Sequence, residues 1–114
     1  MGQETAQSNF RRGVTTLVLL AMLKKEDMYG FQLVQEISNV SDGKIVTQEG
    51  SLYPILYKLL DSGYISDRRV QVGKRLTRVY YHLEPLGEDY LRTLVREYRE
   101  TSRGVQMILE ASEL

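Results

Sequence analysis

The chain of 114 residues contains no cysteine and no tryptophan, only two prolines and a single histidine. Without cysteine, disulfide bonds and thiolate metal sites are excluded. The longest apolar run, Leu17 to Leu23, is too short to span a membrane, which takes about 20 residues. The first residues lack the charged-then-apolar order of a secretory signal. We therefore expect a single-domain cytoplasmic protein with no metal, no cofactor and no membrane contact.

Patterns typical of enzymes are absent as well. The sequence has no glycine-rich phosphate loop, no HExxH motif and no paired carboxylates spaced for acid–base catalysis. His82 lies in a β-rich segment beside Tyr81 with no acid or nucleophile in register with it, so we interpret it as a surface or interface residue. Catalysis is not expected.

The formal net charge is zero, but the charges are unevenly distributed. Residues 10–83 contain eleven Lys and Arg against seven Asp and Glu, whereas residues 84–114 contain four against seven. This asymmetry indicates that the first part faces a polyanion and the last part points away from it.

The first 63 residues predict three short helices. Residues 14–25 are apolar on most sides and end in two lysines, which is typical of a buried helix. Residues 29–40 place apolar side chains three and four apart, and Gly43 follows as a stop signal. The third helix begins near Glu49 and runs to Gly63, a suitable C-terminal cap.

The start of the third helix is unusual because Gly50 and Pro54 both fall within it. If Ser51 is the N-cap, Pro54 lies in the first turn, where its missing N–H costs little. If Thr47 is the N-cap, Pro54 lies deeper and we expect a bend near Gly50.

After Gly63 the periodicity changes from helical to alternating. Residues 64–72 and 75–83 are rich in β-branched and aromatic side chains and flank Gly73, which predicts a hairpin. The hairpin contains one acid, Asp67, and five cations. The cations are Arg68, Arg69, Lys74, Arg75 and Arg78. An isolated basic hairpin is more often simply solvated. A cationic hairpin that follows three short helices is typical of a winged helix-turn-helix that binds DNA.

Pro85 then begins a long helix that we expect to reach Leu114. Along it, one set of side chains is spaced alternately three and four apart, as in a coiled coil. These residues are Leu91, Leu94, Tyr98, Thr101, Val105 and Ile108. The helix could lie back on its own domain, but such a seam more often packs against another chain. We therefore expect a homodimer.

The predicted fold is mainly α with a small β-hairpin: a DNA-binding winged helix over residues 10–83 and a dimerisation helix over residues 84–114. The leucines of the third helix hold it to the core, and its polar side chains face DNA. For its tyrosines, packing is an equally good interpretation, and Tyr53 could serve both roles. The predicted DNA contacts are Tyr29, Gln48, Gly50, Ser51, Tyr53, Tyr57, Lys58, Lys74, Arg75 and Arg78.

Three ordered segments, "MYGFQLVQEI", "EGSLYPILYKLLDSGYI" and "RVYYHLEPLGEDYL", resemble motifs of the PadR family of bacterial transcriptional regulators. That family shows L-Y-G-Y-E-I, E-G-T-L-Y-P-x-L-x-R-L-E-x-x-G-x-I and R-x-Y-Y-x-L-T-x-x-G at these places. The resemblance covers residues 10–100. It implies a winged-helix dimer that binds an inverted-repeat operator, usually as a repressor, and releases it when a small molecule binds.

The single C-terminal helix resembles the compact subfamily that includes lactococcal-type multidrug-resistance regulators. The resemblance implies an apolar pore at the dimer centre, where planar aromatic compounds stack on a tryptophan. In this chain Tyr98 stands at that position, Glu84 replaces the usual Thr cap and Lys58 replaces the usual Arg. The implied effector-binding residues are Leu17, Ala21, Leu91, Val95, Tyr98 and Ser102. Packing of these residues without a cavity is an equally good interpretation.

The sequence thus favours a homodimeric repressor released by a small aromatic effector. Two alternatives have the same fold but no direct DNA binding. One is a winged-helix module for protein–protein contacts, and the other is a ligand sensor that acts through the dimer pore.

Overall fold

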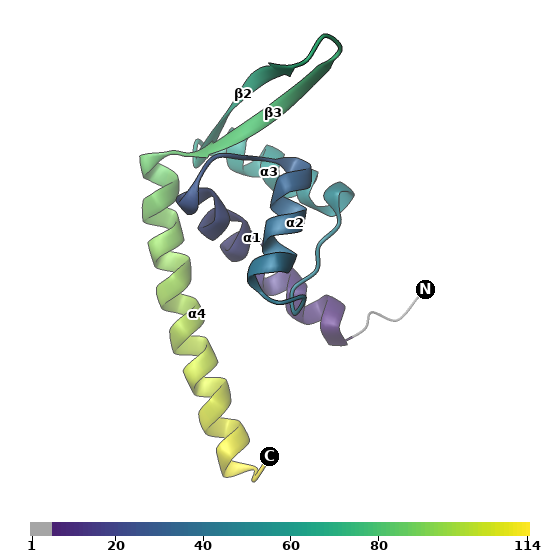
Figure 1. Cartoon of the computed structure of the whole chain (residues 1–114). Helices are drawn as coiled ribbons and strands as arrows, with labels where there is room; N and C mark the ends of the chain where they lie inside the picture. The colour runs from purple at the N-terminus through teal and green to yellow at the C-terminus, as the bar shows by residue number, and fades with distance from the viewer. Residues whose placement is uncertain (1–5) are drawn as a thin grey trace, which may run out of the picture.

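The computed structural model describes residues 6–114, with side chains described from Val14 onward, as four helices and three strands (Figure 1). The elements are α1 (Ala6–Lys25), β1 (Met28–Tyr29), α2 (Gly30–Val40), α3 (Glu49–Asp61), β2 (Ile65–Val72), β3 (Leu76–Leu83) and α4 (Pro85–Ala111). The predicted fold class, mainly helical with a small β-hairpin, is confirmed. None of the helices in the described part of the chain is long and apolar enough to cross a membrane.

The core lies where α1, α2 and α3 meet beneath the base of the hairpin (Figure 1). Its fully buried side chains are Leu19, Leu20, Met28, Leu33, Leu52 and Leu56. In α3 the buried leucines at 52, 56 and 59 form the stripe that the helical periodicity predicts. This stripe fixes which face of α3 remains exposed to solvent.

The three strands form an antiparallel sheet in the order β1-β3-β2. The hairpin of β2 and β3 was predicted, whereas no strand was predicted at residues 28 and 29, and residue 29 was assigned to the second helix. Met28 and Tyr29 pair with Tyr81 and Tyr80 of β3. A strand of two residues is too short to produce an alternating pattern, so only its partner strand defines it.

Helix ends agree only in part with the predictions. Gly63 has φ of 78°, and the N–H of Tyr64 donates to the carbonyl of Leu59, as in a Schellman cap. At the start of α3 neither proposed cap is correct, because the N-cap is Gln48 and its side chain makes no capping hydrogen bond. Pro54 therefore lies inside the helix rather than in its first turn.

The first and last helices also differ from the predicted bounds. α1 begins at Ala6 rather than Val14, and α4 ends at Ala111 rather than Leu114. An apolar pattern marks only the part of a helix that packs on a core. Polar residues lengthen a helix without adding to that signal.

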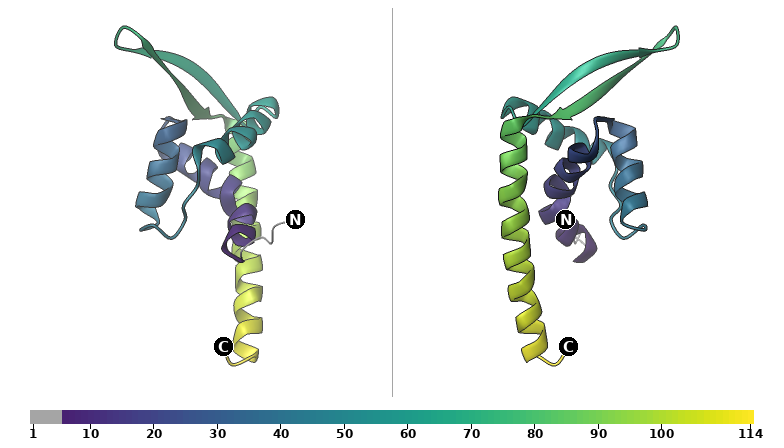
Figure 2. Two further views of the ribbon diagram at one scale, coloured as in Figure 1. Left: turned by 90° about the vertical axis from the view of Figure 1, so that its right-hand side faces the viewer. Right: turned by 60° about the vertical axis from the view of Figure 1, so that its left-hand side comes forward.

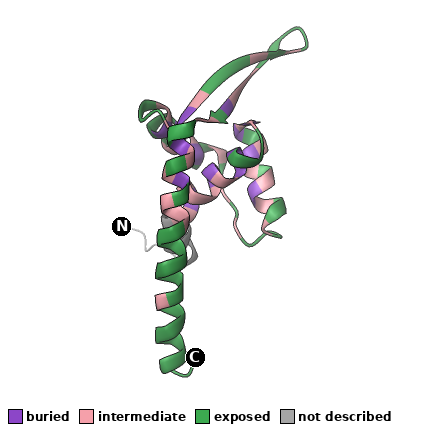
Figure 3. Cartoon of the chain, turned by 90° about the vertical axis from the view of Figure 1, so that its left-hand side faces the viewer, coloured by how far each residue is buried: buried purple, intermediate pink, exposed green. Residues whose placement is uncertain are grey.

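α4 starts against the hairpin base and runs past the rest of the body (Figure 2). At its start the backbone of Gly87 approaches Tyr64 so closely that an added Cβ would lie 1.9 Å from the Tyr64 carbonyl oxygen. The rings of Tyr64 and Tyr90 stack at 4.4 Å. Lys24 of α1 forms an ion pair of 2.9 Å with Glu88. The first part of α4 is therefore firmly joined to the body, whereas the distal part is exposed (Figure 3).

Candidate functional site

The exposed face of α3 carries most of the side chains predicted to contact DNA. Gln48, Gly50, Ser51 and Lys58 are all exposed, and the Tyr57 side chain is 62% exposed. Ser51 lies in the first turn of α3, where its backbone N–H donates a 3.0 Å hydrogen bond to the Gln48 carbonyl and its side chain is exposed. This face thus combines hydrogen-bond donors with the positive end of a helix dipole, which suits phosphate.

Tyr53 lies differently from the other tyrosine of α3. It is half-buried, and its hydroxyl donates a hydrogen bond of 2.7 Å to Oε2 of Glu49. This hydrogen bond and burial raise the pKa of Tyr53 to about 12. An added Cβ at Gly30 would lie 2.8 Å from the Tyr53 hydroxyl, so the glycine at the start of α2 makes room for this ring. Tyr53 therefore braces α3 against α2.

A groove of about 510 Å³ separates the hairpin from the starts of α2 and α3. Its lining combines aromatic rings with charged groups of both signs. Among the residues that line it are Tyr29, Phe31, Glu49, Tyr53, Tyr57, Asp67, Arg69, Leu76, Arg78 and Tyr81. The groove brings together predicted contact residues from three parts of the sequence: Tyr29, the α3 tyrosines and Arg78.

The tip of the hairpin carries exposed Lys74 and Arg75 beyond the groove. The turn is closed by Gly73, whose φ of 71° favours glycine, and its carbonyl accepts a 3.2 Å hydrogen bond from the Gln71 side chain. The hairpin rises well above the helices (Figure 1). Its cations can therefore reach a partner that also touches α3.

His82 is exposed, in agreement with its interpretation as a surface residue, and it contacts an acid from a distant part of the chain. Its Nδ1 lies 2.7 Å from Oδ1 of Asp27, and the other oxygen of Asp27 accepts a hydrogen bond from Arg68. Burial alone would raise the pKa of Asp27, but the hydrogen bonds and charges of His82 and Arg68 outweigh it and lower that pKa. Asp27 lies 55 positions from His82 in the chain, so no local pattern could have revealed the pair.

A second groove, of about 370 Å³ and mostly apolar, lies between α1 and the middle of α4. It brings together Leu17, Tyr98 and Ser102 from the predicted effector set with three residues of the predicted seam. Those seam residues are Leu94, Thr101 and Val105.

The remaining predicted effector residues lie elsewhere. Leu91 is buried, and together with half-buried Val95 it lines a separate hollow of about 540 Å³ near Lys24 and Glu88. Ala21 is half-buried and packs against the core. Only part of the predicted effector set therefore faces one cavity in a single chain.

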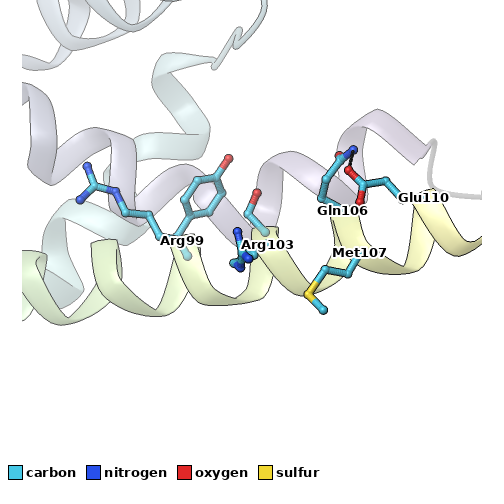
Figure 4. A pocket seen from close by; sticks show the side chains of 7 residues that line it. Arg99, Arg103, Gln106, Met107 and Glu110 are labelled. Atoms are coloured by element: carbon cyan, nitrogen blue, oxygen red, sulfur yellow. Dashed lines mark hydrogen bonds between the residues drawn. The ribbon is translucent and has the colours of Figure 1, made fainter.

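The distal part of α4 exposes large apolar side chains. Tyr98 is 45% exposed, Val105 50% and Ile108 67%. On a neighbouring face, Arg99, Arg103 and Met107 line an open hollow of about 450 Å³, where Gln106 donates a 3.3 Å hydrogen bond to Glu110 (Figure 4). Exposure of several large apolar groups on one helix is typical of a surface that a partner covers.

Among the residues that the structure describes, no group of His, Asp and Glu side chains could hold a metal ion. The polar side chains of the two grooves are instead hydrogen-bonding groups and isolated charges, which suit an organic or polyanionic partner.

The fold and parts of the sequence match known proteins. An uncharacterized protein of Lysinibacillus sphaericus is 29% identical over 107 residues, covering 94% of this chain and 98% of the relative. A transcriptional regulator of Clostridium thermocellum superposes with a TM-score of 0.80 at 27% identity, covering 88% of this chain and 97% of the other.

Bacillus subtilis PadR, solved in complex with operator DNA, matches with a TM-score of 0.67 at 24% identity. The match covers 72% of this chain and 46% of PadR, and it shows the shared fold. The family model of PadR-like transcriptional regulators matches residues 19–93, which include the core helices, the hairpin and the start of α4. The chain therefore belongs to the PadR-like family of transcriptional regulators.

Proposed function

We propose that the protein is a homodimeric repressor that binds duplex DNA and is released by a small aromatic effector. The observation that carries the DNA-binding part is the common orientation of α3 and the basic hairpin. Arg78 of the hairpin and exposed Tyr57 of α3 line the same 510 Å³ groove, while Ser51 and Lys58 are exposed on α3 and Lys74 and Arg75 at the hairpin tip. A helix and a wing that present donors together can grip a major groove and the adjacent backbone.

The similarity to Bacillus subtilis PadR supports this proposal, since that protein was solved with operator DNA. In our proposal residues 10–83 bind DNA and residues 84–114 form the dimer. Two copies related by a two-fold axis would place their α3 helices on half-sites about one helical turn apart, so the operator should be an inverted repeat.

The exposed apolar side chains of distal α4 support the dimer. A second copy would cover Tyr98, Val105 and Ile108, which water surrounds in a single chain. Burial of apolar area stabilises such contacts by about 25 cal/mol per Å². The acidic residues of α4 would lie on the side away from the DNA.

The groove between α1 and α4 is the proposed effector site, and the effector is a planar aromatic compound. Its lining is mainly apolar, and Tyr98 offers a ring for stacking while Ser102 offers a hydroxyl. Because the groove adjoins the proposed dimer surface, a ligand there can favour one angle between subunits. It then changes DNA affinity only by as much as its affinity for the two states differs.

Selection of bound fragments from random duplex DNA tests the proposal most directly. We expect an inverted repeat, protection of both half-sites, and affinity that falls steeply as salt is raised. Recovery of no sequence, or binding that is insensitive to salt, would contradict DNA binding and favour a protein–protein module or a ligand sensor. A reporter placed behind the recovered site should be silenced by the protein if it is a repressor.

The effector site needs a separate test. Planar aromatic dyes should quench tyrosine fluorescence of the wild type, and Tyr98→Ala should weaken that binding. Tyr98→Phe is the matched control, because it keeps the ring face and removes only the hydroxyl. Equal binding by the wild type and Tyr98→Ala would exclude stacking on Tyr98.

A further inference from the structure

Four side chains from three strands form a continuous stack on the sheet. The guanidinium of Arg78 lies over the ring of Tyr29, 4.4 Å from its centroid. Tyr29 meets Tyr80 edge-to-face at 5.4 Å. Arg68 lies over the opposite end of the row, 5.3 Å from the Tyr80 centroid. The strand register explains the alignment, because Tyr80 of β3 is paired with both Tyr29 of β1 and Arg68 of β2.

The two ends of this stack differ. At one end Arg68 is also held by the carboxylate of Asp27, which His82 contacts at 2.7 Å. Glu84 lies 3.7 Å from the other ring nitrogen of His82, so this end is a network of polar and charged groups. The charge of Arg68 is thereby balanced within the protein. Arg68 is a fixed support rather than a free cation.

At the other end Arg78 makes no ion pair with a carboxylate within the described part of the chain. A guanidinium that stacks on a ring uses its flat face, and its N–H donors lie in the plane and remain free. Arg78 and Tyr29 both line the groove between the hairpin and α2, and Tyr29 is the N-cap of α2. The donors of Arg78 thus lie close to the N-terminus of α2, where the N-cap Tyr29 makes no side-chain capping hydrogen bond.

We propose that Tyr29 and Tyr80 are positioning residues that hold the guanidinium of Arg78 ready for a backbone phosphate of DNA. This proposal rests on the proposed DNA-binding function. It distinguishes the cations at the hairpin tip from Arg78, which is stacked on a ring. Lys74 and Arg75 at the tip are exposed, and long exposed side chains lose rotamer freedom when they bind. Arg78 is ordered in advance, so less side-chain entropy is lost when it contacts a phosphate.

A double-mutant cycle tests this arrangement. DNA affinity is measured by fluorescence anisotropy on a duplex selected with the wild type, for Tyr29→Leu, Arg78→Ala and the double variant. We expect Tyr29→Leu to weaken binding about fivefold when Arg78 is present, the range of a cation–π contact. In the Arg78→Ala background the same change should have no effect, since nothing is left to position.

Tyr29→Phe distinguishes positioning from a direct contact by the hydroxyl. Phe keeps the ring face, so we expect wild-type affinity, whereas a hydroxyl that binds phosphate would make Phe as harmful as Leu. Tyr80→Leu should act in the same direction by about twofold, because it supports Tyr29 from behind. A Tyr29→Leu and Arg75→Ala pair is the control, and these two changes should be additive.

Arg78→Lys tests the same proposal without changing either tyrosine, so it can be used if a leucine variant fails to fold. Lys retains the charge but lacks the planar face, so its affinity should equal that of Arg78→Ala within about threefold. Wild-type affinity for Arg78→Lys, or additive effects of Tyr29→Leu and Arg78→Ala, would overturn the proposal. These outcomes presuppose that the wild type binds DNA, so absence of wild-type binding would instead refute the proposed function.

Discussion

Two regions of the molecule differ in how many contacts their side chains make within a single chain. One is the wing, the β2–β3 hairpin of residues 65–83, and the other is the distal part of α4. Near the hairpin, contacts between different elements hold the polar and aromatic side chains: Arg68 contacts Asp27, and Arg78 and Tyr80 both contact Tyr29. In distal α4, by contrast, the side chains of Gln106 and Ser112 donate hydrogen bonds only to residues four positions earlier or later, and Val105 and Ile108 are exposed. This difference supports our proposal that a single chain completes the surface for DNA, whereas a second copy completes the distal helix.

Val105→Asp should have the largest effect, because it places a charge on the surface that we expect a second copy to cover. The variant should elute as a monomer near 13.2 kDa while the wild type elutes at roughly twice that mass. DNA affinity should fall a hundredfold or more, since linking two binding heads contributes on the order of 10² to 10⁴. Size-exclusion chromatography with light scattering and anisotropy measure the two effects.

Arg96→Asp is the matched control, since it adds the same carboxylate to an exposed position of α4 outside the seam. It should leave the mass unchanged. Equal masses for Val105→Asp and the wild type would show that distal α4 does not form the dimer.

Substitution of two glycines of α4, one near its start and one in its distal part, compares the two parts of this helix. Gly87→Ala should destabilise the protein by about 2–3 kcal/mol, because the new Cβ meets backbone that cannot move freely. Gly104→Ala meets nothing within 4 Å and should stabilise by up to about 1 kcal/mol, since alanine favours helix. Urea unfolding measures both. A loss of stability on Gly104→Ala would indicate that a partner approaches there.

The tip of the wing should affect DNA binding but not folding. Lys74→Ala with Arg75→Ala should reduce the slope of log affinity against log salt by about 2, close to 0.9 per lost phosphate contact. The unfolding midpoint should not change, because both side chains are exposed. An unchanged salt slope would mean that the tip does not touch the phosphate backbone.

The smallest effect concerns the ion pairs of Asp27. Its folded-state pKa lies below the ordinary value of 3.8, so the charged form stabilises the folded state. This stabilisation is complete above that value and is lost as the pH falls through the lower folded-state pKa. Asp27→Asn should therefore cost about 0.5–1 kcal/mol at neutral pH, and the difference should shrink in strong acid.

Asp61→Asn is the control for Asp27→Asn, since Asp61 is exposed at the end of α3. It should cause no loss of stability at neutral pH. A pH-independent difference between Asp27→Asn and the wild type would mean that the ion pairs contribute nothing.

The sequence predicted local features well. The leucines of α3 indicated its buried face, Gly63 its C-terminal end, and Gly73 the turn of the hairpin. It also identified the family through ordered motifs, and the family match confirms that resemblance. For these features the residues that carry the signal lie within one element, so periodicity and turn chemistry are sufficient.

Other features could not be read in this way. β1 was not predicted, and the sequence did not indicate the hydrogen bond from the Tyr53 hydroxyl to Glu49. The N-cap of α3 was also misassigned, because Thr47 and Ser51 have the right chemistry but Gln48 occupies the position. Side-chain type alone does not determine which of several candidate residues adopts the extended backbone of a cap.

The sequence by itself determined the order of the elements, the leucine stripe of α3 and the concentration of cations in the hairpin. Only the tertiary structure decided that Arg68 is held by Asp27, 41 positions away, and that Arg78 is stacked but unpaired. The physical reason is that hydrophobic periodicity reports how one element meets a core. Partners of charged and aromatic side chains depend on strand register, which brings together residues that are distant in the chain.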